Sequence, residues 1–288
     1  MKDKNQELFL GFVEGLVNYA PEDMDEGFGT FYERFMMNQF LKKLVKRYKF
    51  KSIFEGPSDG ITGIRGINSF PMVEEGCELV YYTPSEREKE LVVETWEKIR
   101  KITNKRLEVK ICHGPPLNFP FENNYFDLVW NFCIMEHFYN PLLLLEEMRR
   151  ISKKYVLIMT QNVWNIGTLP HIIYHKIIRK PWDHGNVKWM SFNGIEKLIE
   201  KVDLEIIEKG MLDIPIWPDT WDVPIRGLFK KVLSSRGRSW NWNILSDVSM
   251  KKEYPLIRLG AILEYGSLPK TIKLLWTHHL YVLCGKKR

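Results

Sequence analysis

Short apolar runs alternate with amphipathic stretches along most of the chain. The runs with strand character are 52–55, 78–82, 109–112, 126–130, 155–159, 204–207 and 277–284. Through the fifth run their starts lie about 17 to 30 residues apart, the spacing that a βαβ unit requires. Residues 156–159 are apolar at every position, which suits a strand covered on both faces. The pattern predicts an α/β fold, a Rossmann-like, doubly wound and mostly parallel sheet with helices on both faces.

Helix-start signals stand between these runs. Thr83-Pro84-Ser85-Glu86 predicts a capping box in which Thr83 is the N-cap and Pro84 the first helical residue. Asn140 and Ser191 are expected to cap two later helices, and 31–48 is predicted to be helical. The residues expected to face inward in the three capped helices are Leu91, Val92, Trp96, Ile99, Ile102, Leu142, Leu145, Met148, Ile151, Phe192, Ile195, Leu198, Ile199 and Val202.

Charge is concentrated in one late segment. The whole chain has a formal net charge of +6, and 223–252 alone holds seven basic residues and one acid. The segment is either a solvated insertion or a lid that contacts an anionic or membrane-associated substrate. We expect a single domain over 1–288 with a helical cap at 1–48. Lid segments are expected at 161–190 and 215–272, since loops this long are often functional.

Composition narrows the class of protein. Hydrophobic residues make up 44% and charged residues 27%, which excludes a disordered chain. No apolar run reaches the roughly 18 residues that suggest a membrane-spanning helix. The four cysteines form no CxxC pair, and residues 1–7 do not resemble a secretion signal. We therefore expect a soluble, cytoplasmic protein.

A glycine-containing loop follows the first predicted strand. Glu55 ends the strand, and glycines stand at 56, 60, 63 and 66 before the next helix. Glycine permits positive φ and close approach of the backbone to a ligand. The pattern is typical of a cradle for an adenosine-type cofactor, and a tight strand-to-helix connection is the alternative.

A second motif points to a family. Residues 118–128 carry Asn-Phe-Pro-Phe-Glu followed by Phe126-Asp127, then Glu136-His137, then Leu-Glu-Glu-Met-Arg-Arg at 145–150. This order resembles class I S-adenosylmethionine-dependent methyltransferases, in the branch that acts on small molecules and lipids. The resemblance covers about 30–210. It implies a seven-stranded sheet that ends in an antiparallel hairpin, with S-adenosylmethionine as the cofactor.

The resemblance also implies the positions of a binding site. The candidate cofactor-binding residues are Tyr32, Arg34, Glu55, Gly56, Pro57, Ser58, Asp59, Gly60, Thr83, Pro84, His113, Gly114, Asn131 and Phe132.

Four residues depart from the family pattern. Pro57 and Asp59 stand where the first two glycines of the family loop belong. Thr83 replaces the acid that binds the ribose, and His113 replaces the acid near the adenine. A catalytically inactive methyltransferase-fold protein that acts as a binding or scaffold module therefore stays an alternative.

Histidines supply the remaining candidate chemistry. His137 could act as a general base near neutral pH, with a purely structural role as the alternative. Asp127 is expected to make structural hydrogen bonds. His171, His175 and His184 are spaced by four and then nine residues without an evident carboxylate ligand, so no metal site is expected from the spacing alone.

The expected activity is transfer of a methyl group from S-adenosylmethionine to an O, N or C nucleophile of a small-molecule or lipid-like acceptor. Contact with a membrane surface through 223–252 is a further expectation. An RNA methyltransferase ranks lower and a nucleic-acid partner is not expected, because no RNA-binding module is recognisable.

Overall fold

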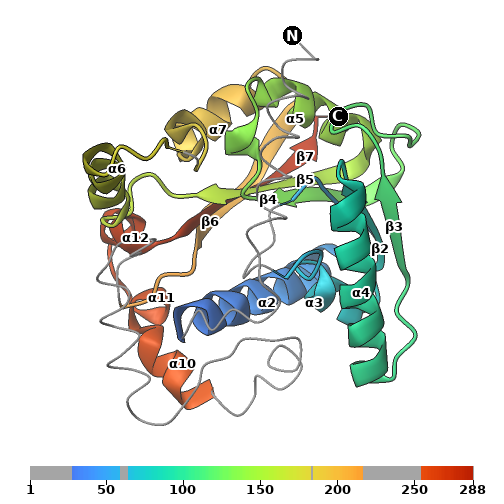
Figure 1. Ribbon diagram of the computed structural model, residues 1–288, viewed down its shortest axis with the longest axis horizontal. Coiled ribbons are helices and arrows are strands. Elements are labelled where there is room, and N and C mark those ends of the chain that lie inside the picture. Colours follow the sequence, from blue (N-terminus) through green and yellow to red (C-terminus); the bar gives the residue numbers. More distant parts are fainter. Residues whose placement is uncertain (1–27, 59–63, 183, 217–253, 288) are drawn as a thin grey trace.

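The computed structural model describes residues 28–58, 64–182, 184–216 and 254–287 (Figure 1). The predictions for Asp59, Gly60 and the basic segment 223–252 lie outside the described residues. The same holds for residues 1–27 of the predicted 1–48 cap and for residues 217–253 of the predicted 215–272 lid.

Seven strands form one sheet in the order β3-β2-β1-β4-β5-β7-β6. Strands β1 to β6 are parallel to one another, and β7 runs antiparallel between β5 and β6. This confirms the predicted α/β fold and its antiparallel C-terminal hairpin. The bounds are Ser52–Glu55 (β1), Glu78–Thr83 (β2), Val109–His113 (β3), Phe126–Phe132 (β4), Ser152–Gln161 (β5), Leu204–Leu212 (β6) and His279–Lys286 (β7).

The strand order reverses between β1 and β4. Ile53, Phe54 and Glu55 pair with Leu128, Val129 and Trp130, while the other side of β1 pairs with β2. The helices that follow β1 and β4 lie on opposite faces (Figure 1). Open α/β sheets bind ligands at such a switch point, beyond the carboxyl ends of the strands.

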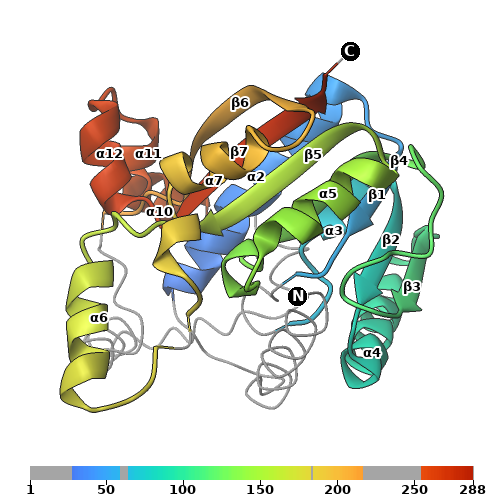
Figure 2. The same ribbon diagram turned by 90° about the horizontal axis from the view of Figure 1, so that it is seen from above.

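Helices cover both faces of the sheet (Figures 1 and 2). Helices α2 (Phe28–Tyr48), α3 (Phe70–Glu74) and α4 (Glu86–Thr103) lie on one face, and α5 (Pro141–Ile151) and α7 (Phe192–Ile199) lie on the other. Each face has its own apolar core. Trp96 is fully buried in the first core and Met148 in the second.

The remaining elements lie towards the carboxyl edge of the parallel strands. They are the 3₁₀ turns η2 (Met135–His137) and η3 (Val187–Trp189), and helices α6 (Thr168–Ile177), α10 (Tyr254–Gly260), α11 (Ile262–Tyr265) and α12 (Lys270–Trp276). Ile257 and Ala261 are buried in the same core as α2, so the chain that precedes β7 is fastened to the first face. Among the described residues, no helix has the length and apolar character needed to cross a membrane.

Local sequence signals correctly predicted most of the helix starts. Asn140 and Ser191 are N-caps, and their side chains accept hydrogen bonds from the backbone N–H groups of Leu142 and Gly194. The predicted cap at Thr83 is wrong by two residues, because Ser85 is the N-cap of α4 and accepts from the N–H of Glu88. Ile102 is also placed incorrectly, since it is 38% exposed near the end of α4.

Candidate functional site

The carboxyl edge of the sheet gathers residues that are far apart in the sequence. Because six strands are parallel, their last residues lie along one edge, and β7 contributes its first residue there. In sheet order these residues are His113, Thr83, Glu55, Phe132, Gln161, His279 and Leu212. Several of the predicted cofactor-binding positions are therefore neighbours.

Glu55 lies fully buried at the switch point. Its carboxylate accepts from the Ser69 N–H at 3.1 Å and from the Ser69 hydroxyl at 2.5 Å, and the Trp130 indole N–H donates to that hydroxyl at 3.0 Å. Burial raises the pKa of Glu55 to about 7, against the lowering effect of the Ser69 hydrogen bond and the Arg34 charge. A buried acid that titrates near neutrality is typical of functional sites.

The loop after β1 crosses to β4. Gly56 donates its N–H to the Trp130 carbonyl at 3.1 Å, the Gly56–Pro57 peptide is cis, and the Phe132 N–H donates to the Ser58 hydroxyl at 3.2 Å. Gly56 has φ of 141°, and a Cβ there would lie 2.1 Å from the carbonyl oxygen of Tyr82. Glycine at 56 is thus required by close approach of two backbones.

The polar side chains at the ends of β2 and β3 are bonded to one another. The Thr83 hydroxyl donates to Glu88, whose other carboxylate oxygen accepts from the Tyr81 hydroxyl at 2.9 Å. A carboxylate is therefore present near the end of β2, although it comes from the first turn of α4. Position 83 lacks the acid of the family pattern, and the threonine there bonds to the buried acid Glu88.

His113 and Gly114 adjoin this arrangement. The His113 ring contacts the Pro84 carbonyl at 3.1 Å through Nε2 and the Glu86 carboxylate at 3.0 Å through Nδ1. Gly114 donates its N–H to the Thr83 carbonyl at 3.2 Å. The structure therefore brings Thr83, Pro84, His113 and Gly114 together.

Three other predicted residues are held by structural contacts. Tyr32 is buried and donates its hydroxyl to Glu264 at 2.6 Å, and Arg34 is buried and donates to the Ile67 carbonyl at 2.6 Å. The Asn131 amide donates to the Met148 sulfur of α5. Its Oδ1 is buried without a hydrogen-bond partner among the described residues.

Sequence reasoning missed a buried acid–imidazole cluster at the β5-β7-β6 end of the edge. His279 Nδ1 lies 3.7 Å from Asp213 Oδ2, and its Nε2 lies 3.6 Å from Glu33 Oε1. His278 Nδ1 lies 2.8 Å from the same Asp213 oxygen. Only the pairing of β6 with β7 brings residues 213 and 279 together, so no local motif could reveal the cluster.

The cluster is joined to the cofactor side of the edge. The His279 ring packs against Phe132 with centroids 5.0 Å apart. Burial lowers the pKa of His279 to about 4, although Asp213 opposes the shift and His278 adds to it. His279 is therefore a neutral imidazole at pH 7, the form that can accept a proton.

His137 ends the η2 turn after β4 and is half-buried. Its backbone N–H donates to the Ile134 carbonyl at 3.0 Å. Asp127 has the structural role predicted for it, because its carboxylate accepts from the Lys51 and Ser52 N–H groups at 2.9 and 3.1 Å.

The residues at this edge fit a ligand that carries both hydrogen-bond donors and positive charge. S-adenosylmethionine presents an amino group and two ribose hydroxyls. The edge offers the buried carboxylate of Glu55 and the unsatisfied acceptor of Asn131. A buried acceptor of this kind is costly unless a donor reaches it, which favours a ligand at this position.

Comparison with known proteins bears on the fold and on the family that this chain resembles. Residues 63–159 match the family model described as a methyltransferase domain. A possible histamine N-methyltransferase from Thermotoga maritima has a similar structure, with a TM-score of 0.52 at 14% identity over 90% of this chain and 92% of that one. A proposed sarcosine dimethylglycine methyltransferase from Galdieria sulphuraria gives 0.51 at 12% identity over 87% and 85%. These two similarities show the fold.

One further similarity is short. A stretch of 71 residues is 27% identical to glutamate–tRNA ligase from Legionella pneumophila (strain Paris). It covers 25% of this chain and only 14% of that protein, and so carries no functional conclusion.

Proposed function

We propose that this chain is a class I S-adenosylmethionine-dependent methyltransferase and that it methylates an O, N or C nucleophile of a small-molecule or lipid-like acceptor. The match of residues 63–159 to a methyltransferase domain and the fold support the proposal. The observation that carries the proposal is the set of polar residues along the carboxyl edge, namely His113, Thr83, Glu55, Gln161 and His279. A cofactor end and an acceptor end can both be accommodated along such an edge.

The cofactor end lies at β1, β2 and β3. Glu55, Ser58, Gly114 and the backbone of Phe132 would hold S-adenosylmethionine, with Arg34 behind Glu55. When bound, this cofactor supplies a methyl group that its sulfonium already activates. The protein therefore needs mainly to align the reactants and exclude water, and the buried residues at the edge suit that task.

The acceptor end lies at β5, β7 and β6. His279 is neutral, and Asp213 and Glu33 flank its two ring nitrogens at 3.7 and 3.6 Å. An acceptor that must lose a proton would give it to His279. Asp213 favours the imidazolium that forms, although burial holds the pKa of His279 low. His137, the base expected from the sequence, is the competing candidate because it follows β4 at the same edge.

Label transfer tests the proposal. The purified chain is incubated with methyl-tritiated S-adenosylmethionine and a small-molecule and lipid extract, and the radioactivity is followed into organic-extractable and polar fractions. We expect enzyme-dependent label in one of these fractions. Label that transfers only to RNA in a parallel incubation with total RNA, or no transfer although the cofactor binds, would contradict the proposed activity.

One observation favours a second candidate, a non-catalytic binding module. Thr83, Tyr81 and Glu88 satisfy one another at the end of β2, where the family holds the ribose. A chain that bound another ligand would need no free acid there. Binding of S-adenosylmethionine without any transfer, or no binding at all, would favour this candidate.

A further inference from the structure

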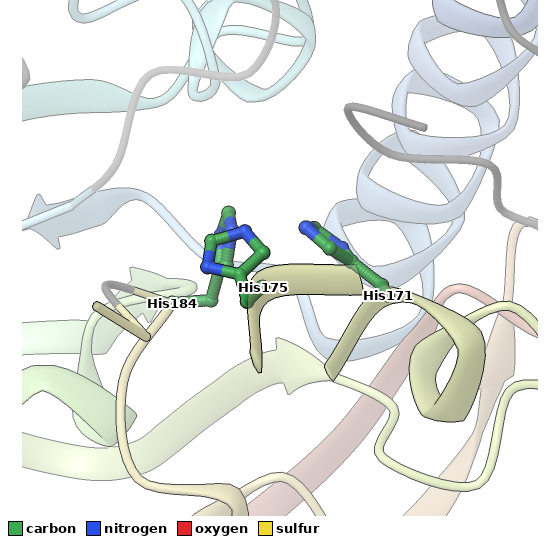
Figure 3. A group of neighbouring side chains, drawn as sticks. All are labelled: His171, His175 and His184. Carbon is green, nitrogen blue, oxygen red and sulfur yellow. The ribbon is translucent and has the colours of Figure 1, made fainter. Parts of the chain in front are cut away.

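Three imidazoles gather on one side of helix α6. His171 and His175 are four positions apart and share a face of the helix, and His184 reaches the same place from the following loop (Figure 3). Each offers one nitrogen, and the three nitrogens lie within 4.8 Å of one another. His171 and His175 are buried, and His184 is half-buried.

His175 is prepared to act as a ligand. Its Nδ1 lies 3.0 Å from the Pro181 carbonyl oxygen, which can only accept, so we assign the ring proton to Nδ1. Nε2 then carries a lone pair, and it has no hydrogen-bond partner among the described residues although the side chain is only 2% exposed. A ring that donates one nitrogen to a backbone carbonyl and keeps the other for a metal is the usual arrangement of a histidine ligand.

The Trp182 ring contacts all three imidazoles of the cluster. Its ring packs edge-on against those of His171, His175 and His184 with centroid distances of 5.5, 5.5 and 4.9 Å. The Trp182 indole N–H donates to the Gly185 carbonyl at 2.7 Å, which fixes the ring. An apolar wall of this kind limits access of water to the nitrogens.

The loop that carries His184 is anchored at the carboxyl edge. Asn186 donates its N–H to the Glu136 carbonyl at 2.8 Å, and a Cβ at Gly185 would lie 2.8 Å from Glu136 Cγ. The Glu136 carboxylate also accepts from the Gln161 N–H at 3.3 Å, at the end of β5. The position of His184 is thus set by contacts other than a metal, so the three rings are brought together in advance.

We propose that His171, His175 and His184 bind a divalent first-row transition metal ion, with Zn²⁺ as the closest match. Imidazole ligands without thiolates suit zinc and its neighbours, whereas Mg²⁺ and Ca²⁺ prefer oxygen ligands. Three nitrogens around tetrahedral zinc lie about 3.4 Å apart. The cluster therefore needs only a small contraction, and a fourth position is left for water or another ligand.

This site departs from the expectation drawn from spacing. Residues 175 and 184 are nine positions apart, and only the turn of the chain after α6 brings the third ring back to the first two. Metal binding here does not depend on the methyltransferase activity, and it is tested by measurements of bound metal.

The test uses the full chain without an affinity tag, because polyhistidine tags bind zinc themselves. The protein is stripped with a chelator and titrated with Zn²⁺ in the presence of millimolar Mg²⁺, and bound zinc is measured by calorimetry and elemental analysis. We expect one zinc ion per chain and a rise in Tm on binding, with no effect of Mg²⁺. Addition of Co²⁺ should give the intense visible absorption of a tetrahedral site.

Single variants decide which residues are ligands. His175→Gln should weaken zinc binding at least about 100-fold, since removal of even an outer partner of a ligand costs 10- to 100-fold. His113→Gln is the matched control and should keep full stoichiometry. Circular dichroism of each stripped variant shows whether it is folded before metal is added.

A second cluster provides the sharpest contrast. Glu33, Asp213 and His279 also hold three ligand atoms within 4.8 Å of one another. Loss of zinc in His279→Gln with full retention in a folded His175→Gln would overturn the proposal, as would the absence of zinc binding to the stripped wild type.

Discussion

The Nδ1 atom of His279 lies 3.7 Å from Oδ2 of Asp213, although the two residues are separated by 66 positions. The contact exists because β6 ends and β7 begins at the same edge of the sheet. It places a neutral imidazole beside a buried carboxylate, and the same ring packs against Phe132 of the proposed cofactor position.

This contact predicts the effect of His279→Gln. The variant should lower kcat by on the order of 10²-fold, the usual contribution of a positioned base, while the Kd for S-adenosylmethionine changes less than about threefold. His137→Gln is the matched comparison. If instead His137→Gln abolishes turnover and His279→Gln leaves kcat intact, the base is His137.

Glu55 predicts a specific dependence of stability on pH. Its pKa rises from 4.5 in the unfolded chain to about 7 in the fold, so between these values the folded state binds more protons. The free energy of unfolding contributed by this group therefore falls as pH rises from 4.5 through 7, by up to about 3 kcal/mol. Urea titrations of the wild type and Glu55→Gln across this range should show a shallower fall in the variant.

His279 should have the opposite effect on the pH dependence of stability. Its pKa is lowered from 6.5 to about 4, so between these values the unfolded chain binds more protons. The stability that it contributes is complete above pH 6.5 and is lost as pH falls towards 4. His279→Gln should remove part of this acid loss. A steeper acid loss in that variant would contradict the buried, neutral state of His279.

A side chain at position 56 should lower the free energy of unfolding through a steric clash. This effect can be measured separately from the cost of backbone strain. Both Gly56 and Gly76 have positive φ, but a Cβ at 56 would lie 2.1 Å from the Tyr82 carbonyl oxygen, whereas nothing lies within 4 Å at 76. Gly76→Ala should cost about 1–2 kcal/mol from backbone conformation. Gly56→Ala should cost at least about 2 kcal/mol more. Equal losses in urea denaturation would show that β1 and β2 do not approach as described.

Thr83 and Glu88 predict a further effect on stability. Thr83→Val removes the hydroxyl donor from a buried carboxylate and should lower the free energy of unfolding by about 1–3 kcal/mol. Thr83→Ser keeps the donor and should cost much less. Similar losses in both variants would mean that the hydrogen bond to Glu88 contributes nothing measurable.

The sequence predicted the sheet well because its signals are local. Alternation of apolar runs with capped helices is sufficient to predict the parallel strands, and Asn140 and Ser191 cap their helices by contacts within three residues. The error at Thr83 has a physical cause. Two hydroxyls stand near the start of α4, and only the fold shows that Glu88 takes one while Ser85 caps the helix.

The candidate site was predictable only in part. Glu55 and His113 end strands and Gly56 follows one, so the sequence order already places them at one edge. The Ser69 hydroxyl that bonds Glu55, the Asp213 carboxylate beside His279 and the ring of His184 beside His175 depend on long-range packing. Sequence spacing contains no signal for such contacts.

The most direct test of the central claim is calorimetric titration of S-adenosylmethionine into the full chain and into Gly114→Val. A Cβ at Gly114 would lie 2.2 Å from the Tyr82 hydroxyl, so the variant disturbs the edge where β2 and β3 end. The account predicts saturable binding of one cofactor per chain in the wild type and at least about tenfold weaker binding in a folded Gly114→Val. Absence of binding to the wild type at millimolar S-adenosylmethionine would contradict it.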